Sequence, residues 1–338
     1  MNDILDKVGE LIDSSLNIPI EIKPIVKAIC RGYIRESKGK IPVEGIINVC
    51  NTTFVPINDG DMNFSGDERI LGTTETDYDE QCNVIHKMSY INDPNYIKLI
   101  SILVHELGHV ITESRPCEIN NDGVYPFAKR TTTIYQNCFY ENGILKIKSG
   151  LFGYRMADGF LESISTKIFT SSEFRQELLD AGYDLGDYVY KDMRIFPSRI
   201  YDEYKACFEL FDYIMDGVLF DFSCMSFDSN DDIRDFIIKN RLNIILGYID
   251  KSNDALWKLK SYEGKERDDV FDKLLQEYID AKKTSLDVAS VSCEFYGKSL
   301  DDPKYNELLR VYESTLANQK RLPIPDDFLK EKDNTFSN

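Results

Sequence analysis

Residues 95–114 of this chain read NYIKLISILVHELGHVITES, and this stretch decides how the rest of the fold can be arranged. Its apolar side chains recur every three or four residues, which is the spacing that places them on one face of an α-helix. These positions are Ile97, Ile100, Leu103, Val104, Leu107 and Ile111. The residues that flank the polar group in the middle of the stretch are uncharged, so the sequence predicts a buried helix.

The polar residues of this helix form His105-Glu106-Leu107-Gly108-His109, an H-E-x-x-H pattern. Residues four apart lie on the same helix face, so both imidazoles can reach a single tetrahedral Zn²⁺ ion. Glu106 lies roughly 100° around the helix, beside such an ion. There it can act as general base toward a water whose pKa zinc lowers to about 7. At Gly108, which has no side chain, we expect another backbone segment to approach closely.

The third protein ligand is the open question, because catalytic zinc sites usually have three. No histidine follows His109, and Thr112 and Arg115 stand where a metzincin would have glycine and histidine. The third ligand is therefore expected to be a carboxylate. His86, which precedes the helix, is a less favoured candidate.

Asp158 and Glu162 are the candidate carboxylates. They lie one turn apart in MADGFLESISTKIF, residues 156–169, which has helical spacing. Glu162 stands between apolar residues, where an acid requires a functional reason, and it is the preferred zinc ligand. Asp158 is the second candidate, since an acid is also favoured near a helix start. If one of them binds zinc, the other can hydrogen-bond a ligating histidine.

The segments HELGHVITE (105–113) and GFLESIST (159–166) resemble the gluzincin clan of zinc peptidases. They are similar in particular to bacterial or phage HELGH proteins, whose second helix reads G-L-N-E-G-x-T-E, and this alignment implies Glu162 as third ligand. Alignment with the E-x-x-x-E helix of the lethal-factor peptidases implies Asp158 instead, an aspartate in place of glutamate, with Glu162 as its partner. Those peptidases also carry an oxyanion-stabilising tyrosine about two turns before the third ligand, a position that Tyr154 matches. The resemblance covers about residues 80–170, and the spacer between the two segments is much longer than in thermolysin-like enzymes.

The rest of the chain divides into a mixed first half and a helical second half. We expect helices at 3–14 and 21–36, strands at 45–56 and 82–91, a polar loop at 57–80 and a hairpin at 131–149 that turns at Asn142-Gly143. Further helices are expected at 156–169, 201–218, 231–249, 266–293 and 302–320.

The predicted class is therefore α+β. We expect a zincin-like domain at 1–170, a helical subdomain at 171–322 and a flexible tail at 323–338. An alternative is that the helices after residue 170 complete the first domain.

Composition limits the class of partner. The chain has 40 Lys and Arg against 58 Asp and Glu, a formal net charge of −18, which disfavours nucleic acid and anionic membranes. We find no signal-peptide pattern and no span of membrane length, so a cytoplasmic protein is expected. The eight cysteines include no C-x-x-C pair and are expected to be free thiols.

The predicted function is hydrolysis of a peptide or protein substrate by a zinc peptidase, with Glu106 as base and zinc and Tyr154 at the oxyanion. The alternative is a zinc-binding regulatory or interaction protein on a peptidase scaffold, with weak or no turnover. A tyrosine-rich stretch between Tyr183 and Tyr213, which includes Tyr201, is expected to pack between helices.

Overall fold

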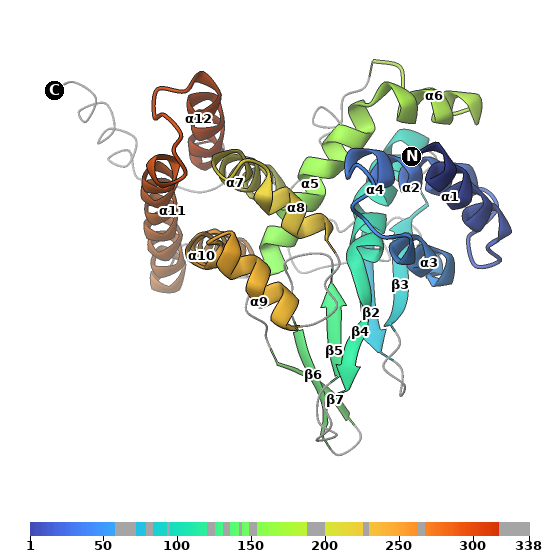
Figure 1. The fold of residues 1–338 in the computed structure, drawn as a ribbon, viewed down its shortest axis with the longest axis horizontal. Helices are drawn as coiled ribbons and strands as arrows, with labels where there is room; N and C mark the ends of the chain where they lie inside the picture. The colour runs from blue at the N-terminus through green and yellow to red at the C-terminus, as the bar shows by residue number, and fades with distance from the viewer. Residues whose placement is uncertain are drawn as a thin grey trace.

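The computed structural model describes residues 1–57, 72–78, 84–92, 95–119, 126–130, 136–141, 144–148, 154–187, 200–225, 230–262 and 268–317. Over these residues the protein has the predicted α+β class. A three-stranded sheet and a four-stranded sheet accompany a mostly helical remainder (Figure 1).

Three helices open the chain: α1 (Asn2–Ser14), α2 (Lys23–Glu36) and α3 (Val43–Asn51). The first two confirm the predicted helices. Pro24 lies in the first turn of α2, where its missing N–H is not needed by the helix. The buried face of α2 carries Ile25, Ile29 and Tyr33 and packs into the core of the molecule.

The prediction of a strand over residues 45–56 is wrong in its first part. Helix α3 continues to Asn51, and only β1 (Thr53–Ile57) is extended. The reason is close packing on the central helix, since a Cβ built on Gly45 would lie 2.2 Å from the carbonyl oxygen of Ile111. Tertiary packing here overrides the strand preference of a segment rich in Ile and Val.

The predicted loop over residues 57–80 is also wrong in part, because it contains strand β2 (Gly72–Tyr78). This strand pairs antiparallel with β3 (Val84–Ile91), the strand that was predicted at 82–91. Strand β1 pairs parallel with the other edge of β3, which gives the order β1-β3-β2. β2 is thus an edge of this sheet, and it lies beside the central helix.

That central helix is α4 (Tyr96–Thr112), which confirms the helix predicted at 95–114. Every side chain from Leu99 to Thr112 is buried except that of His109. The helix ends at Thr112 because the chain becomes extended at Glu113.

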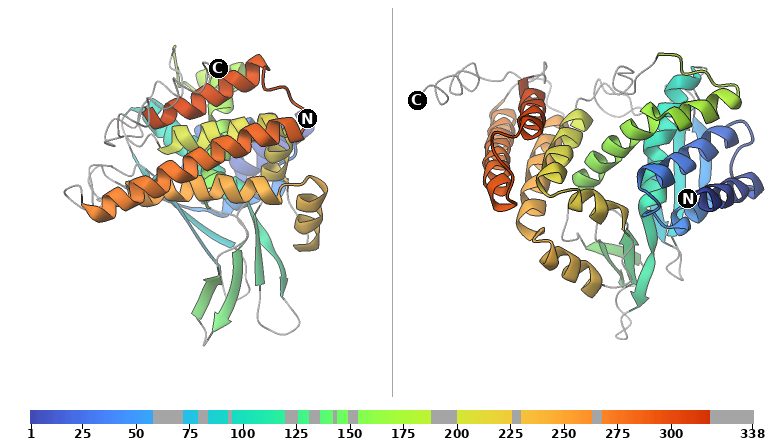
Figure 2. Two further views of the ribbon diagram at one scale, coloured as in Figure 1. Left: turned by 90° about the vertical axis from the view of Figure 1, so that its left-hand side faces the viewer. Right: turned by 45° about the horizontal axis from the view of Figure 1, so that its top comes forward.

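A second sheet follows α4 and projects from the body of the molecule (Figures 1 and 2). Its strands are β4 (Glu113–Ile119), β5 (Pro126–Arg130), β6 (Gln136–Glu141) and β7 (Ile144–Lys148), in the order β4-β5-β6-β7. β6 and β7 pair antiparallel and confirm the predicted hairpin; its turn at Asn142-Gly143 lies outside the described residues.

The remaining described chain is helical. Its helices are α5 (Tyr154–Thr170), α6 (Ser172–Asp180), α7 (Ile200–Ile214), α8 (Val218–Cys224), α9 (Asn230–Lys239), α10 (Asn243–Lys260), α11 (Asp269–Phe295) and α12 (Pro303–Ala317). Two predicted helices are interrupted. The chain takes positive φ at Asp216 and Gly217 between α7 and α8, and at Arg241 between α9 and α10. A left-handed residue cannot continue a right-handed helix, so each pattern divides there.

The larger of two apolar clusters in the described residues runs from Val8 in α1 to Tyr312 in α12 and therefore crosses residue 170, whereas the smaller lies wholly within the later helices. Figure 1 shows α5 and α7 between the N-terminal helices and the group α10–α12. This continuity favours the alternative in which the later helices complete the first domain. The subdomain division at residue 170 stays a prediction, and the predicted tail at 323–338 lies outside the described residues.

Two smaller predictions concern thiols and membranes. Cys30, Cys50, Cys207, Cys224 and Cys293 are free, and four of them are buried. The side chains of Cys82, Cys117 and Cys138 lie outside the described part of the chain. Among the helices that the structure describes, none combines the length and the apolar character that crossing a bilayer requires.

Candidate metal site

The packing of α5 on α4 brings together His105, His109 and Asp158. One ligand atom from each of these side chains lies within 4.8 Å of the other two. The two imidazole rings are 5.1 Å apart between centroids, and Nε2 of His109 lies 3.6 Å from Oδ1 of Asp158. Three donors from two helices are therefore close enough to share one ion.

Glu162 occupies a different position, behind His105. Its Oε1 lies 3.0 Å from Nδ1 of His105, within hydrogen-bonding distance. Glu162 was predicted from the sequence as the third ligand, but the three-residue cluster contains Asp158 instead. The geometry thus favours the second alternative, in which Asp158 joins the histidines and Glu162 supports one of them.

His86 does not join this cluster either. It lies on β3, is buried, and has its Nδ1 3.3 Å from the hydroxyl of Thr76 on the neighbouring strand. This environment is that of a buried histidine within the sheet.

The buried acids favour a positive charge at His105. Burial lowers the pKa of this imidazole, but hydrogen bonding to Glu162 and the negative charges of Glu162, Glu106 and Asp158 outweigh burial and raise it to about 9. These acids are almost fully buried, as is His105. The side chain of His109 is 20% exposed, so the cluster meets solvent on that side.

Glu106 lies on the same helix and is held by the edge strand β2. The hydroxyl of Thr74 donates a hydrogen bond of 2.9 Å to Oε2 of Glu106. Burial raises the pKa of Glu106, whereas His105 and the Thr74 hydroxyl act in the opposite direction. Gly72 permits the close approach of the strand, because a Cβ built on it would lie 2.8 Å from Cγ of Glu106. Thr74 was not predicted as a site residue, although the β-branched residues Thr73, Thr74 and Thr76 are typical of a strand.

Gly108 makes room for side chains, and the predicted approach of another backbone segment is wrong. A Cβ built on it would lie 2.2 Å from the hydroxyl of Tyr33 and 2.7 Å from Cδ2 of Leu161. The Tyr33 hydroxyl donates a 2.9 Å hydrogen bond to the carbonyl oxygen of Val104 and lies 3.3 Å from the hydroxyl of Ser165. Tyr33 therefore ties α2 to both α4 and α5 beside the metal cluster.

We expect Gly108→Ala to destabilise the fold by about 1–3 kcal/mol, because it overpacks this contact. In a Tyr33→Phe background the same change should cost less, since the nearest clashing atom is gone. The free energy of unfolding in urea measures both effects. Gly247→Ala is the matched control: a Cβ there meets nothing within 4 Å, and alanine should favour α10. Equal losses at Gly108 and Gly247 would contradict the assignment.

Two tyrosines, Tyr154 and Tyr201, also bear on the site. Tyr154, predicted at the oxyanion, is the first residue of α5, and its side chain lies outside the described part of the structure. Tyr201 on α7 packs edge-on against His105, with 5.2 Å between ring centroids. Tyr201 was predicted only to pack between helices. Its contact with His105 was not predicted, because no local sequence pattern connects α7 with α4.

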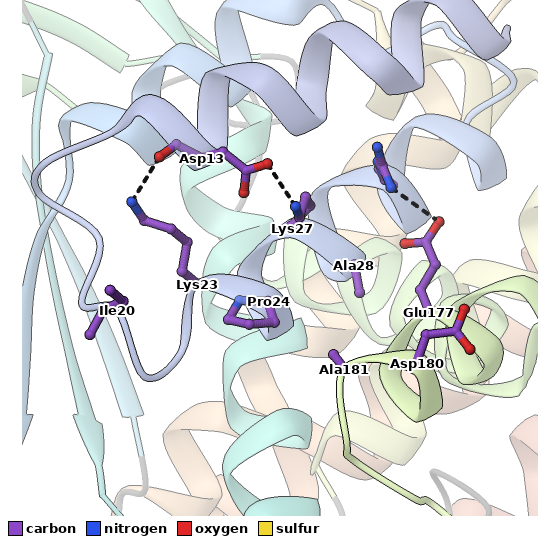
Figure 3. Close-up of a pocket in the computed structure, with 10 residues that line it drawn as sticks. Asp13, Ile20, Lys23, Pro24, Lys27, Ala28, Glu177, Asp180 and Ala181 are labelled. Atoms are coloured by element: carbon purple, nitrogen blue, oxygen red, sulfur yellow. Dashed lines mark hydrogen bonds and ion pairs between the residues drawn. The ribbon is translucent and has the colours of Figure 1, made fainter.

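A separate groove of about 410 Å³ lies between α1, α2 and α6. Figure 3 shows Lys23 and Lys27 directed toward Asp13, with Glu177 and Asp180 on α6 across the groove. None of the residues that line it belongs to the metal cluster. Its charges of both signs indicate no particular ligand.

The chain matches no protein-family model, no curated protein and no solved structure. The functional assignment therefore depends on the site itself.

Proposed function

We propose that this protein is a zinc-dependent peptidase whose metal is held by His105, His109 and Asp158. The observation that carries the proposal is the convergence of these three donors from two helices, next to a buried Glu106. The same sequence pattern on an exposed helix, without the acid from α5, would support metal binding much less well.

The donor set fits zinc. Two imidazoles and one carboxylate are a known ligand combination of catalytic zinc sites, which keep a further position open. A tetrahedral ion with bonds of about 2.0–2.1 Å holds its ligand atoms roughly 3.3 Å apart. The 3.6 Å between Nε2 of His109 and Oδ1 of Asp158 is close to that separation. Calcium and magnesium fit less well, since both prefer oxygen donors.

Glu162 contributes by orienting a ligand. A carboxylate at Nδ1 of a metal-binding histidine fixes the tautomer that presents Nε2 to the metal. Glu162 can take this role, since its Oε1 lies 3.0 Å from Nδ1 of His105. Because Glu162 follows Asp158 by one turn of α5, a single helix supplies both a ligand and the support of another ligand.

The chemistry proposed is hydrolysis of an amide bond. Zinc bound here would supply an activated water and polarise the carbonyl of a peptide. Glu106 would accept a proton at its carboxylate and return it to the leaving amine. Thr74 orients that carboxylate through its 2.9 Å hydrogen bond, and burial keeps bulk water away from the proton transfer.

The proposal extends to the fold and the family. A buried H-E-x-x-H helix beside a small sheet and a second helix that carries an acid support a zincin-like domain. Within it, the site is of gluzincin type, with Asp158 in place of the glutamate that the resemblance implies. This departure corresponds to the lethal-factor alignment, in which Asp158 is the third ligand and Glu162 is its partner.

The direct test is metal content together with peptide cleavage. The wild type should bind one Zn²⁺ per chain and cleave members of a peptide library, and chelation should abolish cleavage. His109→Ala should lose both properties while remaining folded by circular dichroism. A wild type that binds no zinc would refute the proposal. Zinc binding without any cleavage would favour a regulatory protein on a peptidase scaffold.

A second pair of variants separates the two acids of α5. Glu162→Gln is expected to weaken zinc binding roughly 10- to 100-fold, the usual cost of losing the partner of a ligand. Asp158→Asn is expected to weaken it further, because it removes a charged donor. Competition with a chromophoric chelator gives both affinities. The reverse order would restore Glu162 as the ligand.

A further inference from the structure

Helix α7 presents two functional faces. Residues two apart on a helix are separated by roughly 200°, so Tyr201 and Glu203 point in nearly opposite directions. Tyr201 faces the metal cluster through His105, and Glu203 faces α11 and α12. A helix of the second half is therefore held between the site and the helices beyond it.

On its inner face α7 is pressed against α5. A Cβ built on Gly159 would lie 2.5 Å from the carbonyl oxygen of Tyr204, and the rings of Phe160 and Phe208 are 5.7 Å apart. Gly159 directly follows Asp158. The backbones of the two helices therefore approach each other closely beside the proposed ligand.

On its outer face α7 is held by a buried ion pair. Glu203 accepts a 2.9 Å hydrogen bond from Nζ of Lys282 and a 2.6 Å bond from the hydroxyl of Tyr278. Glu203 and Lys282 are fully buried. The hydroxyl of Thr315 on α12 accepts a hydrogen bond from Lys282 and lies 3.3 Å from the same carboxylate. A network of this kind has directional requirements, so it fixes the rotation of α7 about its axis.

Tyr201 lies among the charged groups of the site. Its ring is inclined by 70° to that of His105, with 5.2 Å between centroids, and its centroid lies 6.1 Å from that of Tyr204. Burial raises the pKa of Tyr201 well above its ordinary value, and the charges of Asp158, Glu106 and Glu162 add to that effect. The phenol therefore stays neutral beside the carboxylates.

We propose that Tyr201 is a positioning residue for His105, supplied to the metal site by the helical half of the chain. Glu162 fixes the direction of the imidazole at Nδ1, and the Tyr201 ring restricts its rotation from the side. The helical half of the chain then contributes a residue to the metal site. A displacement of α7 is therefore expected to lower the affinity of the site for metal. This inference rests on the proposed function, because it takes His105 to be a zinc ligand.

Cobalt binding tests the inference apart from turnover. Wild type, Tyr201→Phe, Tyr201→Leu and Tyr201→Ala are titrated with Co²⁺, and affinity and the visible absorption spectrum are recorded. Tyr201→Phe keeps the ring and should match the wild type within about threefold. Tyr201→Ala should bind Co²⁺ roughly 10- to 100-fold more weakly, with an altered spectrum, as expected when a ligand loses its outer support. Tyr201→Leu retains apolar volume without an aromatic edge, and it provides the same readout if the alanine variant unfolds.

Tyr96→Ala is the matched control, a tyrosine at the exposed start of α4 whose loss should leave the spectrum unchanged. Wild-type affinity and spectrum in Tyr201→Leu and Tyr201→Ala would overturn the inference while leaving the metal site intact. An equal loss in Tyr201→Phe would also overturn it, because the hydroxyl rather than the ring would then be responsible. A wild type that binds no Co²⁺ would overturn the inference and the proposed function together.

Discussion

Replacing Glu106 by glutamine is expected to leave zinc bound and to lower peptide hydrolysis by about 10²- to 10⁴-fold, the usual contribution of a general base. Glutamine keeps the shape of the side chain and can still receive the hydrogen bond that Thr74 donates to Oε2. It cannot accept a proton from water at neutral pH. The variant therefore separates the chemistry of the proton from the binding of the metal.

Zinc content and kcat/KM on one cleaved peptide provide the measurement. Glu75→Gln is the matched control, because Glu75 lies on the same strand as Thr74 but is exposed and paired with Lys87. It should retain wild-type activity. Undiminished hydrolysis in Glu106→Gln would remove Glu106 from the mechanism, whatever the zinc content.

Lys282→Met is expected to destabilise the protein by about 3–5 kcal/mol, which is the usual result of removing one partner of a buried ion pair. Methionine has a similar length and fills the space among α7, α11 and α12. It leaves the fully buried carboxylate of Glu203 without its cation, and the hydroxyls of Tyr278 and Thr315 do not neutralise that charge. The cost is therefore electrostatic rather than a cavity.

Urea denaturation gives the free energy of unfolding for this variant and its controls. Lys283→Met changes the neighbouring exposed lysine on α11 and should fall within about 0.5 kcal/mol of the wild type. The double variant Glu203→Gln/Lys282→Met removes both charges and should be more stable than Lys282→Met alone. A single variant as stable as the Lys283→Met control would show that the pair does not hold α7.

The local features of the fold were predictable from the sequence. Helices α1, α2 and α4 follow from the spacing of apolar residues, and the β6–β7 hairpin from two strand-like segments around Asn142-Gly143. The H-E-x-x-H pattern and the apolar residues around it are enough to predict that His105, Glu106 and His109 lie on a buried helix. Each of these predictions depends only on residues a few positions apart. The period of a helix or strand determines which of those residues share a face, so the spacing of apolar residues shows it directly.

Errors arose where a distant segment decides the local structure. Helix α3 forms in a segment rich in Ile and Val because Gly45 lets it pack on the carbonyl of Ile111. Strand β2 forms in a polar segment because it pairs with β3 and contacts α4 through Gly72 and Thr74. In both cases the contacting segment is remote in the sequence, so no local pattern could predict the secondary structure of α3 or β2.

The sequence by itself determined that this protein has a buried helix that carries two histidines and a glutamate, and that α5 brings two acids one turn apart. Only the tertiary structure shows which histidine each of those acids lies beside. Asp158 and Glu162 share a face of α5, and the axial position of α5 along α4 sets which carboxylate lies beside His109 and which behind His105. The tertiary structure also brings Tyr201, which lies on α7, into contact with His105 on α4. Spacing within one helix fixes which side chains share a face, whereas packing between helices fixes what that face meets.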